Sequence, residues 1–233
     1  MKQKVLGAVL AGVFVPAVAF GQMVYMESNG SHCVSGECDW YVGVNANVNA
    51  WSWKNKYDTA YSSTNPDYSS DSYSFETVFG GSVVAGKYFE PNIRGDIEIG
   101  LSSKFSDSDD GFDYSLSAAY IMVNGYYDFD FGLYVGGGIG IARSVTKLNS
   151  DTFDSTTDET NSSLDPKFGA AVGYAFNITD NVALDFRYRL SGFNVAGISR
   201  YFYQAGTGNR FALTVKSDML IENTLSVGVR YTF

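Results

Sequence analysis

The sequence contains no long apolar run beyond residue 20. The run before that point, residues 5–20, is shorter than the roughly 20 residues that a membrane-spanning helix needs, and Pro16 lies within it. This shortage excludes a helical membrane protein. The remaining chain, residues 22–233, has a length that an all-β barrel commonly reaches as one domain.

Basic residues are also scarce, since 16 Lys and Arg stand against 25 Asp and Glu for a net charge of −9. Removal of Lys2 and Lys4 with an N-terminal leader would take away two positive charges and no acid, which makes the balance more negative still. A protein that binds nucleic acid needs a basic face to neutralise phosphates. We therefore expect no nucleic-acid partner.

Histidine is nearly absent, which limits the chemistry that is available. A serine nucleophile usually needs a histidine base, and the single histidine, His32, precedes the first predicted strand. The run 136–140 is rich in glycine but lacks the third spaced glycine and the lysine of nucleotide-binding loops. The acidic loops lack the EF-hand pattern for a divalent cation. We expect no catalytic residue, no metal site and no cofactor, and hence no enzyme.

The N-terminus has the features of a secretory signal peptide, because Lys2 and Lys4 precede a short apolar run that ends in small residues. Cleavage after Ala19 or after Gly21 fits this pattern, and we prefer Gly21. No cysteine follows the run at the position that a lipid anchor requires. The predicted organisation is a signal peptide at 1–21, a periplasmic segment at 22–39 and a β-barrel domain at 40–233.

The two cysteines, Cys33 and Cys38, lie close together before the first strand. In an oxidising periplasm, a local disulfide is the first expectation. The alternative is a metal site that includes His32, but three ligands fall short of the usual four. We predict the disulfide.

Apolar and polar residues alternate along much of the chain, which indicates strands with one dry and one wet face. From residue 40, Val42, Val44 and Val48 alternate with Gly43, Asn45 and Asn47. Only 4 prolines, beside 25 glycines and 17 each of Tyr and Phe, suit such strands. Eight strands are predicted, at 40–51, 77–89, 93–105, 114–127, 133–147, 167–176, 182–192 and 220–233.

The predicted connections alternate in length. Those at 90–92, 128–132 and 177–181 are short and turn-like, whereas those at 52–76, 106–113, 148–166 and 193–219 are long. A soluble sandwich has no reason for this alternation, but outer-membrane barrels have short periplasmic turns and longer external loops. The prediction is an all-β fold: a closed, antiparallel, eight-stranded transmembrane β-barrel.

Charged residues occupy one face of three predicted strands, where they alternate with apolar residues that suit lipid. Placing an Arg at the lipid midplane would cost about 2–4 kcal/mol, so these charges should face the lumen together. The predicted lumen network consists of Arg94, Asp96, Glu98, Asp185, Arg187, Arg189 and Arg230. One interpretation is an ion-pair network that plugs a narrow barrel, and the other is a gated polar path. Small residues at 136, 138, 140, 169 and 173 should leave room for these long side chains.

The chain resembles the superfamily of small eight-stranded outer-membrane barrels that includes the OmpA-type transmembrane domains and the opacity-type surface proteins. The last strand carries the most specific element, with Val229, Tyr231 and the terminal Phe233 resembling the signal that the barrel assembly machinery reads. The resemblance implies the outer membrane of a Gram-negative bacterium, contact with lipid and lipopolysaccharide, and a monomer.

The last long connection predicts a projecting hairpin, with 198–203 paired against 210–215. Arg200, Tyr201, Tyr203 and Arg210 would offer cationic and aromatic side chains to an extracellular partner. Two functions therefore stay open. The first is a structural or interaction protein of the cell surface, like an adhesin or surface antigen, and the second is a narrow porin-like channel for small ions or solutes.

Overall fold

The structure is a computed structural model, and it describes residues 33–34, 37–61, 67–109, 112–150, 160–203 and 210–233. The chain divides into two compact units, Met1–Gly30 and Ser31–Phe233, and all described residues belong to the second. The predicted signal peptide lies outside the described residues. Within them, no helix is long and apolar enough to cross a membrane.

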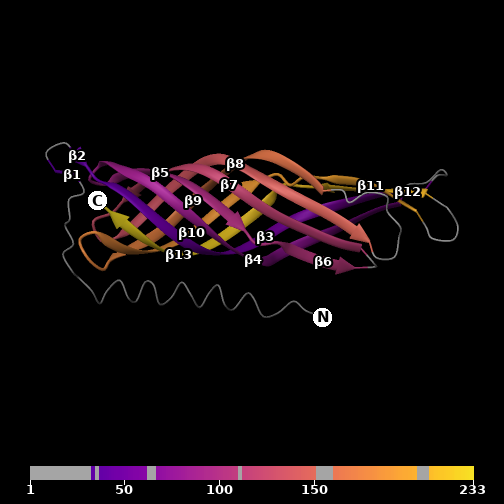
Figure 1. Ribbon diagram of the computed structural model, residues 1–233, viewed down its shortest axis with the longest axis horizontal. Coiled ribbons are helices and arrows are strands. Elements are labelled where there is room, and N and C mark those ends of the chain that lie inside the picture. Colours follow the sequence, from indigo (N-terminus) through magenta and orange to yellow (C-terminus); the bar gives the residue numbers. More distant parts are fainter. Residues whose placement is uncertain (1–32, 35–36, 62–66, 110–111, 151–159, 204–209) are drawn as a thin grey trace. The chain divides into compact units, whose positions relative to one another are not determined.

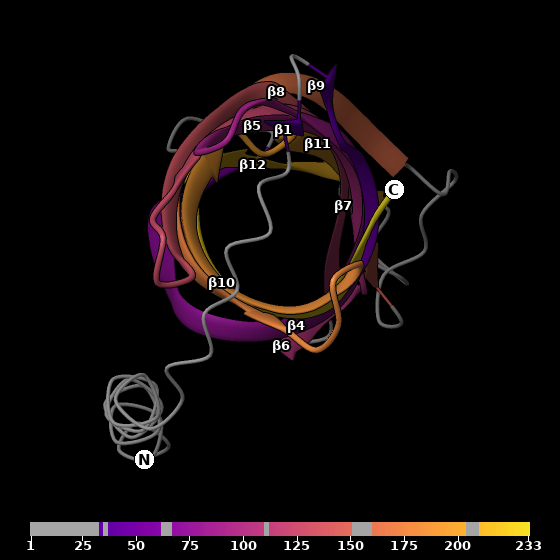
Figure 2. The same cartoon turned by 90° about the vertical axis from the view of Figure 1, so that its left-hand side faces the viewer.

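Eight strands form a closed antiparallel barrel in the described part of the chain. β3 pairs with β13 as well as with β4, which closes the ring (Figure 1, Figure 2). In ring order the strands are β3 (Trp40–Tyr61), β4 (Asp67–Glu90), β5 (Ile93–Ser102), β7 (Phe112–Asp128), β8 (Leu133–Ser150), β9 (Thr160–Asn177), β10 (Val182–Phe193) and β13 (Leu220–Thr232). The predicted fold class is confirmed.

Successive side chains along each strand point to opposite faces of the barrel wall. On β5, Glu98 is fully buried whereas the neighbouring Ile99 is 51% exposed. The alternation continues on β10, where Arg187 is buried and Phe186 is exposed. An outer face of Val, Ile, Leu and Phe would be costly in water but suits the hydrocarbon of a bilayer.

Exposed aromatic side chains gather at the end of the barrel where the turns are short. They are Trp40, Phe89, Tyr127, Phe129, Phe131, Phe176, Tyr231 and Phe233. Aromatic belts of this kind lie at the membrane–water interface of outer-membrane barrels. This end therefore marks one boundary of the membrane.

At the opposite end, the strands continue well beyond their predicted ends. β3 and β4 have 22 and 24 residues, whereas about 9–11 suffice to cross a bilayer. Large parts of the predicted loops 52–76, 106–113 and 148–166 are strand, so these three loop predictions are wrong, whereas 193–219 contains the hairpin that was predicted for it. The physical reason is that the ladder of backbone hydrogen bonds does not need apolar side chains. Strands rich in Tyr, Ser and Thr therefore remain paired where the apolar alternation stops.

Two further strands, β11 (Ile198–Tyr203) and β12 (Arg210–Ser217), form the predicted hairpin, with Ile198 opposite Val215. β12 also pairs with residues 55–61 of β3, which in turn pairs with β4. We call these outer parts of β3 and β4, together with β11 and β12, the projecting sheet. It lies at the end of the barrel away from the C-terminus (Figure 1). A short strand, β6 (Phe105–Asp109), pairs with β7 at the same end.

β1 (Cys33–Val34) and β2 (Glu37–Cys38) form a small antiparallel pair that sets the backbone of Cys33 opposite that of Cys38. The side chains of both cysteines lie outside the described part of the structure. The disulfide therefore stays a prediction.

Candidate functional site: the barrel interior

Arg94, on β5 near the short turns, is held by side chains from three other strands. Its Nε donates to both carboxylate oxygens of Asp128, at 2.9 and 3.1 Å, and its Nη1 donates to the hydroxyl of Tyr41 at 3.1 Å. The ring centroids of Tyr126 and Tyr134 lie 4.1 and 4.7 Å from the guanidinium carbon. Pairing and ring contacts together offset the cost of removing this cation from water.

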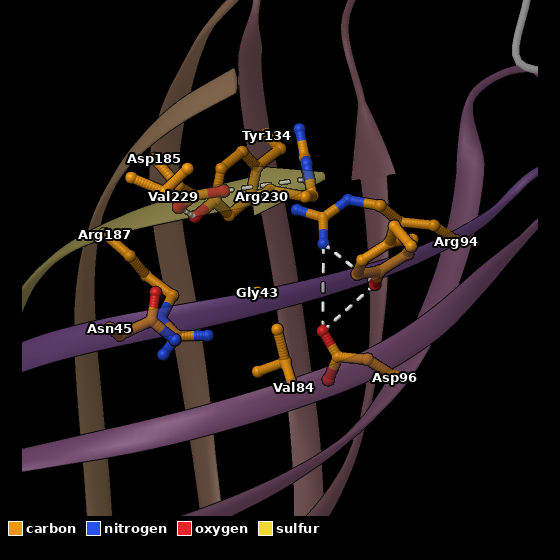
Figure 3. Close-up of a pocket in the computed structure, with 11 residues that line it drawn as sticks. Gly43, Asn45, Val84, Arg94, Asp96, Tyr134, Asp185, Arg187, Val229 and Arg230 are labelled. Atoms are coloured by element: carbon orange, nitrogen blue, oxygen red, sulfur yellow. Dashed lines mark hydrogen bonds and ion pairs between the residues drawn. The ribbon is translucent and has the colours of Figure 1, made fainter. Parts of the chain in front are cut away.

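Asp96 lies two residues after Arg94 on β5, and its side chain points to the same inner face of the wall. It accepts a hydrogen bond from the Tyr41 hydroxyl at 3.0 Å and lies 3.8 Å from Nη1 of Arg94 (Figure 3). It also accepts from Nδ2 of Asn124 at 2.7 Å. The same Asn124 nitrogen is 3.5 Å from Glu98. Asn124 therefore joins the groups around Arg94 to those around Glu98.

Glu98 is the acceptor for two arginines of β10. Its carboxylate accepts from Nη2 of Arg187 at 3.0 Å, from Nη2 of Arg189, and from the Tyr120 hydroxyl at 2.8 Å. Arg187 also donates through Nη1 to the Tyr126 hydroxyl at 3.1 Å. All three charged side chains are buried, so each depends on the others for charge compensation.

The remaining two predicted charges, Arg230 and Asp185, form their own pair at 3.6 Å. The Tyr134 hydroxyl donates to Asp185, and the ring of Tyr134 faces Arg94. The structure thus brings the seven predicted charges together as two groups that meet at the rings of Tyr134 and Tyr41.

A further ion pair, Lys167–Glu222, was missed by the sequence analysis and lies closer to the projecting sheet. Glu222 accepts from Nζ of Lys167, from Nε1 of Trp51 at 2.9 Å and from Oγ of Ser191 at 2.9 Å. The Lys167 ammonium lies 4.4 Å from the centroid of Tyr120. The alternation of inward and outward residues could have identified this pair, because Glu222 shares the inner face of β13 with Arg230.

Above these charges, an apolar cluster fills the interior at the end that bears the projecting sheet. We call it the apolar layer, and its buried members are Trp51, Trp53, Val78, Tyr114, Leu116, Ala142, Leu148, Phe193, Val195, Ile198, Val215 and Leu220. The chain between β10 and β11 contributes Val195 and folds inward, since Thr146 donates to the Ala196 carbonyl at 3.1 Å and the Ala196 amide donates to Ser144 at 3.0 Å. No sequence motif indicated this layer.

The small residues of the wall do not make room for the charged side chains that we expected, since Gly136 and Gly173 face tyrosine rings and Gly138, Gly140 and Gly169 face Asn124, Met122 and Ser191. A Cβ at Gly136 would lie 2.3 Å from the ring of Tyr126, and one at Gly173 would lie 2.3 Å from the ring of Tyr134. Each of these glycines is directly opposite its tyrosine on the neighbouring strand. The expectation failed because tyrosine rings are needed to line and separate the guanidinium groups.

The other predicted residues lie outside the barrel interior. Val229 and Tyr231 face outward on β13, and Phe233 directly follows that strand, with its ring stacked on that of Tyr231 at 6.1 Å. Their role as an assembly signal stays a prediction. The backbone of β11 and β12 carries Arg200, Tyr201, Tyr203 and Arg210, whose side chains lie outside the described part of the structure. Among the described residues, no group of three or more His, Cys, Asp or Glu side chains could hold a metal ion.

Comparison with known proteins agrees with this architecture. The family model of the outer membrane protein beta-barrel domain matches residues 8–233. The chain belongs to this outer-membrane barrel family. The protein is accordingly located in the outer membrane of a Gram-negative bacterium, where it contacts lipid and lipopolysaccharide.

Individual relatives of this outer-membrane barrel are distant. Outer membrane protein PagN of Salmonella typhimurium is 26% identical over 178 residues, which cover 67% of this chain and 73% of PagN. OprG of Pseudomonas aeruginosa has 14% identity and a TM-score of 0.49, with 84% of this chain and 95% of OprG covered. The outer membrane protease OmpT of Escherichia coli has 12% identity and a TM-score of 0.49, with 83% and 97% covered.

Proposed function

We propose that this protein is a closed scaffold that conducts no ions and holds the projecting sheet at the cell surface, where that sheet contacts an extracellular partner. One observation carries the proposal: the apolar layer lies across the interior beyond the charged groups, and it includes Ile198 and Val215 from the base of the projecting sheet. A barrel built for passage would keep a polar lumen along its whole length.

The charged groups below the apolar layer support the same function. Glu98, for example, is occupied by two arginines and a tyrosine, and Glu222 by Lys167, Trp51 and Ser191. Eight strands leave a lumen that side chains fill. Paired charges in such a lumen stabilise the barrel and offer no free path to a passing ion.

The projecting sheet is the part of the molecule available to a partner. β3 and β4 remain paired outward beyond an irregularity at Trp51–Trp53, and β12 pairs with the outer part of β3, which holds these strands together beyond the barrel. Tyr203 and Arg210 occupy paired positions where β11 ends and β12 begins. Aromatic and arginine side chains are the types that most often dominate binding interfaces, so an adhesin-like or antigen-like role follows.

The same proposal assigns no catalytic role. Glu98 and Glu222, two acids of the interior, are engaged with cations, and the apolar layer lies between them and the outer end of the barrel. Purified protein incubated with peptide and lipid-ester substrates should release no product above a heated control.

Conductance in planar bilayers tests the closed state. The protein purified from outer membranes should give no single-channel steps in molar salt, while an open porin in the same bilayers serves as the positive control. Regular steps from the folded, heat-modifiable form would contradict the proposal. They would instead support the second candidate, a narrow channel, which the polar lower part of the interior favours.

The surface role needs a separate experiment. Ser199 and Thr214 are paired in register, so replacing residues 200–213 by Asn-Gly joins them through a two-residue turn that such strands accept. Cells that display the full chain should bind to cultured epithelial cells or matrix proteins, and cells with the shortened hairpin at equal surface amounts should not. Equal binding by both forms would exclude the β11–β12 hairpin as the contact surface.

A further inference from the structure

The exposed Lys and Arg side chains of the described residues all lie toward the end of the barrel that bears the projecting sheet. They are Lys54, Lys56, Lys104, Arg143, Lys147 and Lys216. The short turns at the other end instead expose acids such as Glu90, Asp130 and Asp180. In a chain whose net charge is −9, this separation indicates a negatively charged partner at the outer end.

Three of these cations gather on neighbouring strands, and we call them the basic patch: Lys104, Arg143 and Lys147. Lys104 lies between β5 and β6, and the other two lie on β8. β7 runs between them, with Ala119 opposite Arg143 and Ser115 opposite Lys147. Adjacent strands are about 5 Å apart, so the cations on the two sides of β7 are separated by roughly 10 Å at the backbone.

A β-bulge turns Lys104 toward the outer face. Leu101 pairs with Ala119, but Phe105 pairs with Leu116, so the chain from β5 to β6 contains one residue more than β7 between these two pairs. A bulge of this kind changes which side chains point outward. Phe105 accordingly packs on the interior Trp53, and Lys104 is exposed.

No acid interrupts the basic patch. Segments 101–106, 115–121, 141–147 and 160–164, which lie side by side in the barrel wall, contain neither Asp nor Glu. Among the described residues, no carboxylate forms an ion pair with Lys104, Arg143 or Lys147. Between them β7 presents only the small side chains of Ser115, Ser117 and Ala119. The patch therefore offers three cations and open space above β7 to an external anion.

The basic patch lies at the outer boundary of the lipid-facing surface. Ser117 precedes Tyr127 of the aromatic belt by ten residues on β7. Barrel strands are tilted by about 40°, so ten residues rise by about 25 Å, which is the height of the apolar band. The exposed side chains of Leu101, Ile121 and Ile141 border the patch on its membrane side. Cations and an apolar surface thus meet where lipid headgroups join their acyl chains.

We propose that the basic patch binds the phosphate groups of a lipopolysaccharide molecule in the outer leaflet. Arg143 can bind a phosphate through two parallel hydrogen bonds, and the flexible ammonium groups of Lys104 and Lys147 reach it from either side. The acyl chains of the same molecule lie on Leu101, Ile121 and Ile141. Lipopolysaccharide fits better than a phospholipid, because its several phosphates and acyl chains match cations and apolar residues that extend over three strands.

A triple variant tests the basic patch. Lys104→Gln, Arg143→Gln and Lys147→Gln together should weaken the binding of purified, phosphorylated rough lipopolysaccharide at least about ten-fold, measured by native mass spectrometry on delipidated protein in detergent. All three positions are exposed, and heat-modifiable mobility on gels verifies that the variant folds. Unchanged affinity in the folded variant would overturn the proposal.

The matched control removes the same charge at the same end of the barrel. It combines Lys54→Gln, Lys56→Gln and Lys216→Gln, at a place where Asp218 already lies 3.1 Å from Lys56. This variant should bind lipopolysaccharide nearly as tightly as the unaltered protein. An equal loss in both triple variants would contradict the site and indicate a general attraction to the charged rim.

The unaltered protein distinguishes the sources of phosphate, and this comparison decides if the triple variant does not fold. Lipopolysaccharide from which the phosphates have been removed should bind at least about ten-fold more weakly. Equal affinity for the phosphorylated and dephosphorylated forms would overturn the proposal. Equally tight binding of phosphatidylglycerol would assign the patch to any anionic lipid, and displacement of lipopolysaccharide by millimolar inorganic phosphate would assign it to the free anion. Either result would contradict a lipopolysaccharide site.

Discussion

At the scale of single residues, the interior depends on Glu98, since one carboxylate compensates two buried guanidinium groups. Glu98→Gln should lower the free energy of unfolding by about 3–5 kcal/mol, because it leaves Arg187 and Arg189 without their acid. Denaturant unfolding in lipid vesicles, followed by tryptophan fluorescence, measures this. Glu90→Gln, at an exposed position, is the control and should change stability by less than about 0.5 kcal/mol. Equal midpoints for the two variants would mean that water already screens the Glu98 site.

The close approach of Tyr126 to Gly136 gives a second test at this scale. Gly136→Ala should destabilise the barrel by about 1–3 kcal/mol, because its Cβ would overlap both the tyrosine ring and the carbonyl oxygen of Gly125. Gly125→Ala is the matched control, since a Cβ there has no atom within 4 Å. The same unfolding assay compares them, and a cost that is equal at both positions would exclude the ring contact as the cause.

The sequence predicted seven of the charges that line the interior, but it missed Lys167 and Glu222 and did not show how the charges pair. The alternation of inward and outward residues placed Arg94 and Glu98 on the same inner face of a strand, because a charged side chain in contact with lipid is unfavourable. It could not assign Asp128 as the partner of Arg94, because Asp128 lies at the edge of a turn that composition marks only as polar. Tyr41 and Tyr134 were also missed, since a tyrosine suits the lipid interface as well as the lumen.

At the scale of elements, the alternation along β13 makes the orientation of the wall testable. Val227 is 50% exposed and Ser226 is buried, although they are neighbours. Spin labels introduced as Ser226→Cys and Val227→Cys should differ, with lipid-soluble oxygen reaching position 227 more readily. Greater oxygen access at position 226 would reverse the assignment of inner and outer faces for the whole strand.

The ends of the strands were harder to predict than their existence. The turns near Pro91 and Asp180 contain residues that stop a strand locally, so the short-turn ends match closely. At the other end, β3 and β4 continue through polar residues such as Asn55 and Ser70, where pairing with the neighbouring strand decides the conformation. Such pairing is a long-range property that local periodicity does not report.

At the scale of the whole molecule, the interior has an order along its axis. Arg94, Asp128 and Arg230 lie nearest the short turns, Glu98 follows, then Lys167 with Glu222, and finally the apolar layer beneath the projecting sheet. The registers of β10 and β13 fix this order, because successive inward residues advance along paired strands. An ion that crosses the barrel would have to pass every level in turn.

The apolar layer should be the largest barrier in that series. Moving an ion into a dry apolar region costs several kcal/mol, and each 1.4 kcal/mol lowers the population of the ion there ten-fold. The charged groups, in contrast, offer an ion partners of opposite charge. The double variant Leu116→Ala with Phe193→Ala thins this layer and should open a measurable conductance in planar bilayers. Leu190→Ala with Val227→Ala, at lipid-facing positions, is the control and should stay closed.

Folding must be verified first, because each truncation of a buried residue costs roughly 2–5 kcal/mol and an unfolded barrel would leak without forming a path. Heat-modifiable mobility on gels gives that check for both double variants. Glu98→Gln separates the two possible barriers, since it disturbs the charged levels and leaves the apolar layer intact. If Glu98→Gln conducts ions while the variant with the thinned apolar layer does not, the ion pairs around Glu98 form the barrier. This result would support a narrow channel and contradict the closed scaffold.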